Sequence, residues 1–437
     1  RQRVIANLGR LEELQEGQID RLIDGLARYS MKEWVKARVK AEAICARWSK
    51  EWGPALIFRR IWDKVGLGRS MEKLLQSTQI STDIAEAVFA MVLNRLVEPR
   101  SKRGVSEWIK GVHHPGFESL ELQHFYRALD FLAGHKEQIE DALYRNVQDL
   151  FRLELDLVLW DTTSTYLEGK GPEGFAEYGF SKDHRPDRLQ LVIGVLMTRD
   201  GYPVAHQVFP GNTADVETFR RALEEVRGRF KLRQVILVAD RGMVSRGILE
   251  AIDKAGLEYI VGVRMRKLRQ MDQVLGRAGR FHKVADNLKV KEVIHQKSRY
   301  IVCLNPERAE HDRKARETII ESLQRKLEQQ GARSLIGNGG YRRYLRLEGT
   351  RPTIDQDAIE QESRYDGKYV IRTNTRLSPE DVAMAYKGLW RVERAFRELK
   401  SHLELRPIYH WTEPRIRGHV MVCFLALVLE TLLRKSL

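Results

Sequence analysis

Cysteine is scarce in this sequence, and its placement excludes two classes of protein. The three cysteines, Cys45, Cys303 and Cys423, lie far apart, without a CxxC pair and without paired histidines nearby. Disulfide-rich folds and structural zinc sites need several closely placed sulfur or imidazole ligands. We therefore expect neither kind of site, and we expect the protein to work in a reducing cytoplasm.

The sequence also lacks an apolar signal segment and a long membrane span. It begins RQRVIANLGR, without an initiator Met, so we expect the true N-terminus to lie upstream. The most apolar stretch runs from His419 to Leu433, is short for a membrane span and contains Glu430. We expect it to form a buried terminal helix, and we expect no membrane partner.

Positive charge, by contrast, is abundant. The chain has 75 Lys and Arg against 60 Asp and Glu, a formal net charge of +15, and no long block of one sign. Such a balance favours a polyanionic partner, most often nucleic acid, although ribosomal and membrane-surface proteins share it. Two segments, VEPRSKRG (97–104) and MKEWVKARVK (31–40), suit phosphate contacts or, equally, solvated helix faces.

The length of 437 residues allows two or three folded units. Apolar residues recur at helical spacing in 1–152, which predicts an all-helical N-terminal domain. Short apolar runs in 153–265 predict the first part of an α/β core. The polar, alternating runs and charged helix of 266–365 predict an inserted α+β subdomain, and 366–437 completes the core with a strand and helices.

The order of elements in the core indicates a fold class. Three strands, LELDLVLW, LQLVIGVLM and YPVAHQVF, come first, and they are followed by helix, strand, helix, strand through EYIVGV. Three antiparallel strands followed by alternating helices and strands is the order of ribonuclease-H-like folds. We therefore predict a ribonuclease-H-like mixed sheet.

Two aspartates follow apolar runs in this predicted sheet. Asp161 ends LVLW and begins DTTSTY, and Asp240 closes VILVAD. Each alone is equally well explained as a turn or cap residue. Strand ends that lie side by side in a mixed sheet would bring the pair together, and two such carboxylates repel unless a cation lies between them.

A third carboxylate is expected from a long helix that packs on the sheet, which Ser378 of SPED is expected to cap and which runs through Lys400. The segment AYKGLWRVERAFRELKSHLEL offers Glu393 and Glu398. At about 100° per residue, Glu398 points toward solvent, whereas Glu393 borders the apolar stripe and can reach a metal. That stripe consists of Leu389, Val392, Phe396 and Leu399, and its edge carries Tyr386, Trp390, Glu393 and Lys400.

Side chains near Glu393 are candidates for contacts with DNA. Lys400, two turns later on the same edge, suits a phosphate oxygen, or is an ordinary surface lysine. Trp390 could stack on an unpaired base, although an aromatic residue there is more often part of the core. Tyr386 and Arg397 complete the set of DNA or phosphate contacts that we expect.

Three carboxylates without His or Cys companions favour hard cations over zinc. We therefore expect Asp161, Asp240 and Glu393 to hold two Mg²⁺ ions, with Mn²⁺ as a substitute. Two such ions activate a water or a 3′-hydroxyl and stabilise the leaving oxygen in phosphoryl transfer. No covalent protein nucleophile is needed.

With these residues in place, the chain resembles bacterial insertion-sequence DDE transposases of the IS4-like group, nearest the IS1634 type. The resemblance lies in five segments in order: NRLVEPRSKRGVSEW, WDTTSTYLEG, FPGNTADVETF, VADRGM and YKGLWRVERAFRELKSHLELRPIYHW. The group's signature of Tyr, Arg, Glu and Lys is matched by Tyr386, Glu393 and Lys400, but Leu389 occupies the Arg position. Arg391 and Arg394 differ in helical phase, so that role is not carried over.

The resemblance implies an enzyme that binds terminal inverted repeats and catalyses Mg²⁺-dependent DNA cleavage and strand transfer by a cut-and-paste route. It also implies double-stranded DNA partners, both transposon ends and target, a homodimer in the synaptic complex, and a bacterial, nucleoid-associated location. Two alternatives stay open: a nuclease of the same fold without strand transfer, and a catalytically silent DNA-binding derivative. Gly211, Asn212 and Asp215 are expected as turn residues or as an active-site rim.

Overall fold

The chain forms two compact units, Arg1–Glu51 and Trp52–Leu437, and the second contains both the central sheet and the predicted carboxylates. The expected boundaries at 152, 265 and 365 all lie within it. The basic stretch 31–40 lies outside the described residues. The computed structural model describes residues 49–76, 83–151, 157–229, 236–240, 245–254, 256–268, 270–330, 339–348 and 351–437, with residues 23, 25, 26 and 29.

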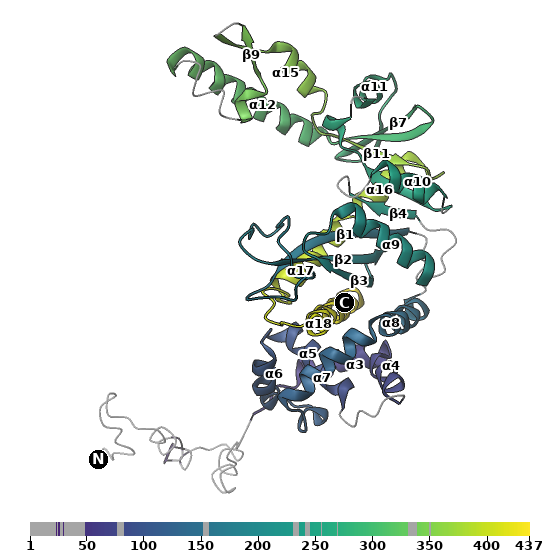
Figure 1. Cartoon of the computed structure of the whole chain (residues 1–437), viewed down its shortest axis with the longest axis vertical. Helices are drawn as coiled ribbons and strands as arrows, with labels where there is room; N and C mark the ends of the chain where they lie inside the picture. Colours follow the sequence, from purple (N-terminus) through teal and green to yellow (C-terminus); the bar gives the residue numbers. More distant parts are fainter. Residues whose placement is uncertain are drawn as a thin grey trace, which may run out of the picture. The chain divides into compact units, whose positions relative to one another are not determined.

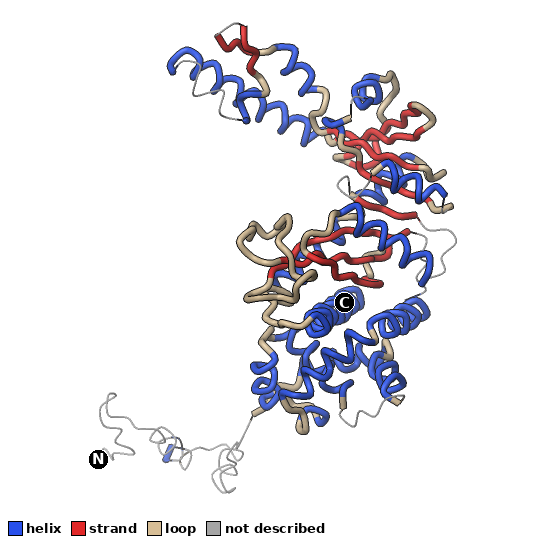
Figure 2. The backbone as a smooth tube through the Cα atoms, viewed as in Figure 1, coloured by secondary structure: helices blue, strands red, loops and turns tan. Residues whose placement is uncertain are grey.

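The second unit begins with helices (Figures 1 and 2). Asp83 and Ser101 cap two of them by accepting hydrogen bonds from the N–H groups of Glu86 and Gly104, as short polar side chains commonly do at helix N-termini. Short 3₁₀ turns follow at Ile109–Gly111 and Pro115–Phe117. The α-helices are α3 (Gly53–Lys64), α4 (Leu67–Leu75), α5 (Ile84–Val97), α6 (Lys102–Trp108), α7 (Leu122–Gly134) and α8 (Lys136–Phe151).

The central sheet has nine strands in the order β3-β2-β1-β4-β5-β11-β8-β7-β6. The first three strands pair antiparallel, and β4 and β5 run parallel to β1. This order of the first five strands is the ribonuclease-H-like arrangement. The elements are β1 (Leu157–Tyr166), β2 (Gln190–Thr198), β3 (Pro203–Pro210), α9 (Asp215–Arg229), β4 (Ile236–Ala239), α10 (Arg246–Lys254) and β5 (Glu258–Gly262).

Residues 266–365, expected as an inserted subdomain, have two parts. One part adds strands to the central sheet, and the other forms a small separate core. Strand β11 lies between β5 and β8 and pairs antiparallel with both, so β6 to β8 extend the central sheet. Leu323 and Tyr344 centre the separate core. The remaining elements are a 3₁₀ turn (Met265–Lys267), α11 (Gln270–Gly276), β6 (His282–Ala285), β7 (Leu288–His295), β8 (Ser298–Leu304), α12 (Pro306–Gln330), α14 (Gly339–Arg342), β9 (Leu345–Glu348), β10 (Arg351–Ile354), α15 (Gln356–Ser363) and β11 (Lys368–Thr373).

Side chains of β1 alternate between two cores. Leu157 and Leu159 pack into the main core, whereas Val158 and Trp160 pack with residues of α9 and α10 on the opposite face of the sheet. The sequence predicts that β1 ends at Trp160, but the strand continues to Tyr166 because β2 pairs with its whole length. Asp161 therefore lies within a strand, on the face of the main core.

The helix expected from Ser378 through Lys400 is instead two helices, α16 (Pro379–Lys387) and α17 (Trp390–Ser401). Ser378 caps α16 as expected, by accepting a hydrogen bond from the Asp381 N–H. The break lies at Gly388 and Leu389, where the N–H groups of residues 391 and 392 bond back only three residues. These tighter 3₁₀-type bonds separate Tyr386 from the continuous helical phase of α17.

The last helix, α18 (Glu413–Ser436), connects the helical region to the sheet. It contacts α5 and α7 on one side and β3 and α17 on the other (Figure 1). By length and composition it could cross a membrane, but 83% of its apolar window is buried inside the fold. Its apolarity is therefore explained by the core that surrounds it, as expected for the stretch from His419 to Leu433.

A buried ionic network adds a second link between helices and sheet. Glu140 of α8 is fully buried and accepts hydrogen bonds from the backbone N–H of His206 in β3, at 3.0 Å, and from the Lys136 Nζ, at 2.9 Å. Arg229 of α9 lies 2.8 Å from the same carboxylate. These cations hold the pKa of Glu140 far below its usual range despite the burial.

Lys102 lies in the segment that suits either phosphate contacts or a solvated helix face, but only 4% of the residue is exposed. Phosphate contact from this side chain is therefore excluded. Burial and the nearby Arg95 guanidinium lower the pKa of Lys102 to about 7. No carboxylate pairs with it among the residues that the structure describes, so its charged form is costly in the folded state.

Replacing Lys102 with Met should therefore stabilise the protein. Because the pKa is lower in the folded than in the unfolded chain, wild-type stability rises as pH increases from about 7 toward 10. We expect Lys102→Met to raise the free energy of unfolding by about 2 kcal/mol at pH 6.5, with a gain that shrinks toward pH 9. Urea denaturation across this pH range measures it, and an equal gain at both pH values would contradict the assignment.

Candidate active site

Asp161 and Asp240 lie side by side because β1 and β4 are paired in parallel register. The pairing places Leu159 opposite Val238 and Trp160 opposite Ala239, so Asp161 of β1 lies beside Asp240, the residue that directly follows β4. Adjacent strands lie about 4.8 Å apart, and residues in register point to the same face. Both carboxylates therefore face the side of the sheet that α17 covers.

Helix α17 supplies the third carboxylate to this face. Its apolar stripe packs into the main core and against β1, as expected, through Val392, Phe396 and Leu399. Glu393 lies at the exposed border of this stripe. Glu398 was expected to point to solvent, but its side chain is only 15% exposed. It lies near Glu430 of α18, whose pKa its charge raises, and 2.7 Å from the His402 Nδ1.

The charges of Asp240 and Glu393 both act on Asp161. Burial is the main cause that raises the pKa of Asp161 to about 6, and these two negative charges contribute, against the opposing charge of Lys182. No group of three His, Cys, Asp or Glu side chains lies within ligation distance of a common point in the described ranges. The donors themselves, all carboxylate oxygens in a site of like charges, fit hard divalent cations.

Tyr386 holds Asp240 in place. Its hydroxyl donates a 2.7 Å hydrogen bond to the Asp240 Oδ1, and its ring stacks on Tyr369 of β11 at a centroid distance of 5.8 Å. A carboxylate that is held by a hydrogen bond keeps its orientation when it binds a metal. Tyr386, expected as a DNA contact, is thus placed to position a carboxylate.

Lys400 is already paired. Its ammonium lies 2.6 Å from the Asp183 Oδ1, only 11% of its side chain is exposed, and Arg406 lies 2.5 Å from the same oxygen. Burial lowers the pKa of Lys400, although Asp183 opposes the change. Two cations on one carboxylate leave a net positive charge at this point, and this charge remains able to attract a phosphate.

The other expected contacts lie on the surface of α17. Trp390 is 48% exposed, and the Arg391 guanidinium lies 5.2 Å from its ring centroid. Arg397 is exposed. Leu389, at the position where the related group has Arg, is 8% exposed and belongs to the main core, so it leaves no cation at that point of the helix.

The loop between β1 and β2 contributes residues that the sequence did not single out, chiefly Lys182 and Asp183. Lys182 donates a 2.6 Å hydrogen bond to the Thr162 carbonyl, and its charge acts on Asp161. Their sequence, SKDHR, resembles any polar loop, so only the fold reveals that they cover β1.

Gly211, Asn212 and Asp215 line a cavity of about 310 Å³ on the other face of β1. Asp215 accepts a hydrogen bond from the Thr162 hydroxyl at 3.1 Å. A Cβ on Gly211 would lie 2.2 Å from the Gln190 carbonyl oxygen, so this position requires glycine. Gly211 and Asn212 thus lie in the turn after β3 and Asp215 begins α9, and their cavity lies on the face of β1 opposite the carboxylates.

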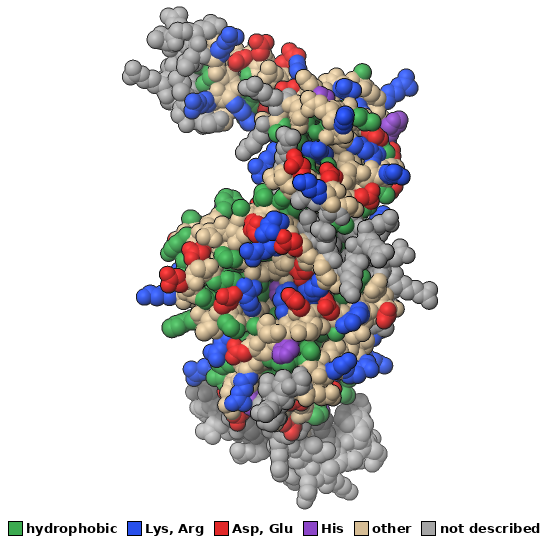
Figure 3. Space-filling view, turned by 45° about the vertical axis from the view of Figure 1, so that its right-hand side comes forward, with side chains coloured by type: hydrophobic (Ala, Val, Ile, Leu, Met, Phe, Trp, Pro, Cys, Tyr) green, Lys and Arg blue, Asp and Glu red, His purple; other side chains and the backbone are tan. Residues whose placement is uncertain are grey.

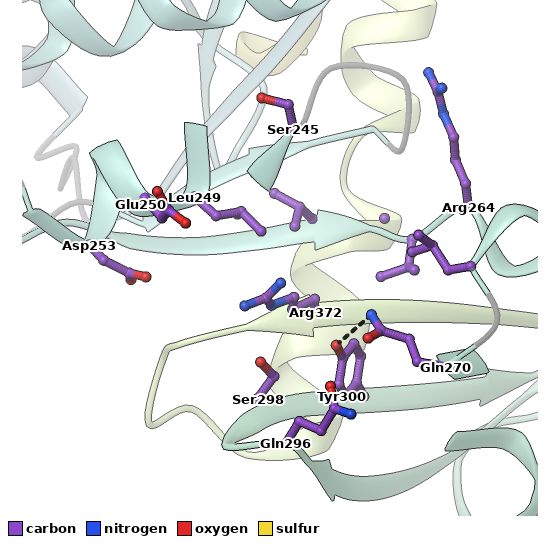
Figure 4. Close-up of a pocket in the computed structure, with 14 residues that line it drawn as sticks. Ser245, Leu249, Glu250, Asp253, Arg264, Gln270, Gln296, Ser298, Tyr300 and Arg372 are labelled. Atoms are coloured by element: carbon purple, nitrogen blue, oxygen red, sulfur yellow. Dashed lines mark hydrogen bonds between the residues drawn. The ribbon is translucent and has the colours of Figure 1, made fainter. Parts of the chain in front are cut away.

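A larger cavity, of about 700 Å³, lies elsewhere on the sheet (Figure 4). Side chains from α10, β5, β8 and β11 line it, among them Asp253, Tyr300 and Arg372, and the Gln270 amide donates a 3.4 Å hydrogen bond to the Tyr300 hydroxyl. Asp161, Asp240 and Glu393 do not line it.

Acidic and basic side chains are interspersed across the face drawn in Figure 3.

Comparison with known proteins identifies the class. Residues 154–429 match the model of the transposase DDE domain, so the chain belongs to the DDE transposases. Residues 1–38 match the N-terminal domain of IS1634 family transposases, so it is an insertion-sequence transposase of the IS1634 type. DDE transposases generally use divalent metal ions. No curated protein matches the chain.

Solved structures of the Mos1 transposase share weak similarity with the chain. A Mos1 mariner paired-end complex with Mn has 11% identity and a TM-score of 0.18, and the match covers 47% of this chain and 76% of that chain. A Mos1 paired-end complex with left transposon end also has 11% identity and a TM-score of 0.18, with 55% and 71% covered.

Replacing Tyr386 with Phe should weaken metal binding without unfolding the protein. The variant keeps the stacked ring and loses the hydrogen bond to Asp240, so we expect the Mg²⁺ concentration for half-maximal DNA cleavage to rise about tenfold. Tyr369→Phe, which removes the hydroxyl of the stacked neighbour, serves as the matched control. An unchanged Mg²⁺ dependence of Tyr386→Phe would contradict this positioning role.

Replacing Asp161 with Asn should stabilise the metal-free protein. Because the folded-state pKa of about 6 exceeds the ordinary value of 3.8, the ionised carboxylate destabilises the fold above pH 6. We expect Asp161→Asn to raise the free energy of unfolding by about 1 kcal/mol at pH 7.5, and this gain should vanish below pH 4. The variant should also lose the increase in melting temperature that Mg²⁺ causes in the wild type. Asp286→Asn changes a side chain that is 96% exposed and serves as the control. In the same thermal denaturation experiments it should change neither the stability nor the effect of Mg²⁺.

Proposed function

We propose that this chain is a cut-and-paste transposase that hydrolyses DNA at the ends of an insertion sequence and joins the freed 3′-hydroxyls to target DNA. The observation that supports the proposal is the pairing of β1 with β4, which brings Asp161 beside Asp240, together with the effect of the Asp240 and Glu393 charges on Asp161. Both reactions are phosphoryl transfers, so one carboxylate site serves them in turn.

The three carboxylates would hold the divalent ions, with Mg²⁺ as the natural metal and Mn²⁺ as a substitute. Two bound ions supply Lewis acids for the attacking and leaving oxygens of an in-line displacement. Asp161 and Asp240 come from rigid adjacent strands, whereas Glu393 comes from a helix. This division suits a site in which two ligands are fixed and the third is set by the packing of α17.

Other residues of this chain orient the carboxylates and attract DNA. Tyr386 fixes one Asp240 oxygen, and the Thr162 backbone N–H donates a 2.7 Å hydrogen bond to the Asp161 Oδ1. The positive charge of Lys400 and Arg406 around Asp183 is placed to attract a phosphate of the bound strand. Trp390 and Arg397 are proposed as further DNA contacts on the surface of the same helix.

The proposal extends to the partners of the reaction. The substrates are double-stranded transposon ends with inverted repeats and a target duplex, and a homodimer would hold two ends together in a synaptic complex. The net charge of +15 supports binding of a polyanion. The proposed place of action is the bacterial nucleoid, and residues 1–152 are proposed to contribute to the binding of ends.

Single carboxylate substitutions test the site. Asp161→Asn, Asp240→Asn and Glu393→Gln should each lower cleavage of an end-containing duplex by about a thousandfold or more while DNA binding persists, because each removes a metal ligand. Glu398→Gln, on the same helix, should stay within about threefold of wild type. Wild-type cleavage by Asp161→Asn, or a larger loss in Glu398→Gln than in Glu393→Gln, would refute the assignment.

A joining assay tests the reaction itself. Wild-type protein, Mg²⁺, a duplex that carries the element's end and a supercoiled plasmid should yield covalently joined end–plasmid products, and chelation of the metal should abolish them. Cleaved ends without joined products would instead favour the nuclease alternative. Binding without cleavage would favour the catalytically silent alternative.

A further inference from the structure

A basic cavity of about 300 Å³ lies against α17, the helix that carries Glu393. It is formed by the first turns of α17, the last turns of α18 and the turn between β2 and β3. Trp390 and Arg391 line it from the turn of α17 that precedes Glu393, whereas Asp161, Asp240 and Glu393 are not among its lining residues. Four cationic side chains line it, namely Arg391, Arg394, Arg434 and Lys435.

The cations in this cavity repel one another. Burial lowers the pKa of Lys435, and the charges of Arg391 and Arg434 lower it further, against the opposing charge of Asp200. The Lys435 ammonium also donates a 2.6 Å hydrogen bond to the Asp200 backbone carbonyl and lies 4.3 Å from the Tyr202 ring centroid. Several positive charges are thus held together, and a bound anion would relieve their repulsion.

Carboxylates compensate only part of this charge. Arg434 lies 3.3 Å from Glu430, and Arg394 lies 3.8 Å from Glu398, each with one turn of the same helix between them. Arg391 forms no ion pair with a carboxylate within the described part of the chain, and its guanidinium lies against Trp390 instead. The guanidinium of Arg391 therefore remains available to a ligand.

Two further features shape the cavity for a polar ligand. Thr431 is 1% exposed, and its hydroxyl has no hydrogen-bond partner among the described atoms. Gly201, at φ +84°, forms the opposite wall, and a Cβ there would lie 3.0 Å from the Arg391 Cδ. Because glycine has no Cβ, residue 201 leaves space for the Arg391 side chain.

We infer that this cavity binds a backbone phosphate of the DNA strand that is cleaved at Asp161, Asp240 and Glu393. Guanidinium groups match phosphate oxygens with paired hydrogen bonds, and the exposed Trp390 ring at the rim suits the adjoining sugar or base. The inference rests on the proposed function for its choice of ligand. It also supplies, from α17 and α18 together, the positive charge that Leu389 does not provide.

The cavity and Lys400 flank Glu393 on α17. Arg391 lies two residues before Glu393 and Lys400 lies seven residues after it, so cations are placed toward both ends of the helix. A DNA strand that contacts both would be held on either side of the cleavage point. Such two-point binding positions the strand without reading its sequence.

The test is DNA binding in EDTA, where no cleavage occurs, with a fluorescent duplex that carries the element's end. The double variant Arg391→Gln, Arg434→Gln should bind about tenfold or more weakly, and the slope of log K against log salt should decrease in magnitude by about 1 to 2. Arg313→Gln, Lys314→Gln removes equal charge from α12 and should change affinity by about twofold or less. Circular dichroism confirms the fold, and Lys435→Gln replaces the double variant if it unfolds.

An affinity and salt slope equal to wild type would overturn the inference, as would an equal loss in the α12 control. Because binding in EDTA is independent of cleavage, failure of this test differs from failure of the proposed function. A protein that neither cleaves nor joins DNA in Mg²⁺ but shows the selective loss in EDTA would retain the phosphate site and lose the proposed activity. Normal joining with no selective loss would reject the site alone.

Discussion

The parallel, in-register pairing of β1 with β4 is the constraint on which the site depends. It fixes Asp161 and Asp240 at the same level on adjacent strands and, through the alternation of side chains, on the same face of the sheet. Burial of the Asp161 carboxylate and its proximity to a like charge oppose the fold, and both raise the pKa of Asp161. The surrounding residues offset part of this cost, because Lys182 supplies positive charge and Tyr386 a hydrogen bond.

Helix α17 contributes both to the packing of the core and to the proposed active site. One side of it is buried against β1, and its border carries Glu393, so the packing that stabilises the fold also sets the position of the third carboxylate. The same helix presents Trp390 and Arg391 before Glu393 and Lys400 after it. A helix that is fixed by its apolar stripe can hold these groups in a constant arrangement, which a mobile loop could not do.

Local periodicity was enough to predict the parts of the site that depend on a single element. The apolar runs before Asp161 and Asp240 and the stripe beside Glu393 are local signals, and in the structure the charges of Asp240 and Glu393 act on Asp161. Non-local contacts could not be predicted. The pairing of Lys400 with Asp183, the burial of Glu398 against α18 and the addition of β6 to β8 to the sheet all depend on partners far along the chain. The break between α16 and α17, just before Trp390, is different because a local signal marked it. That signal is Gly388, since glycine often ends a helix, and our prediction did not use it.

The most direct test of the account is to locate the metal ions themselves. Anomalous diffraction from a crystal of the protein with a transposon-end duplex and Mn²⁺ would do so. The account predicts Mn²⁺ peaks bound by Asp161 and Asp240, with Glu393 as a further ligand. Manganese at any other cluster of side chains, or bound to Glu398 in place of Glu393, would contradict it.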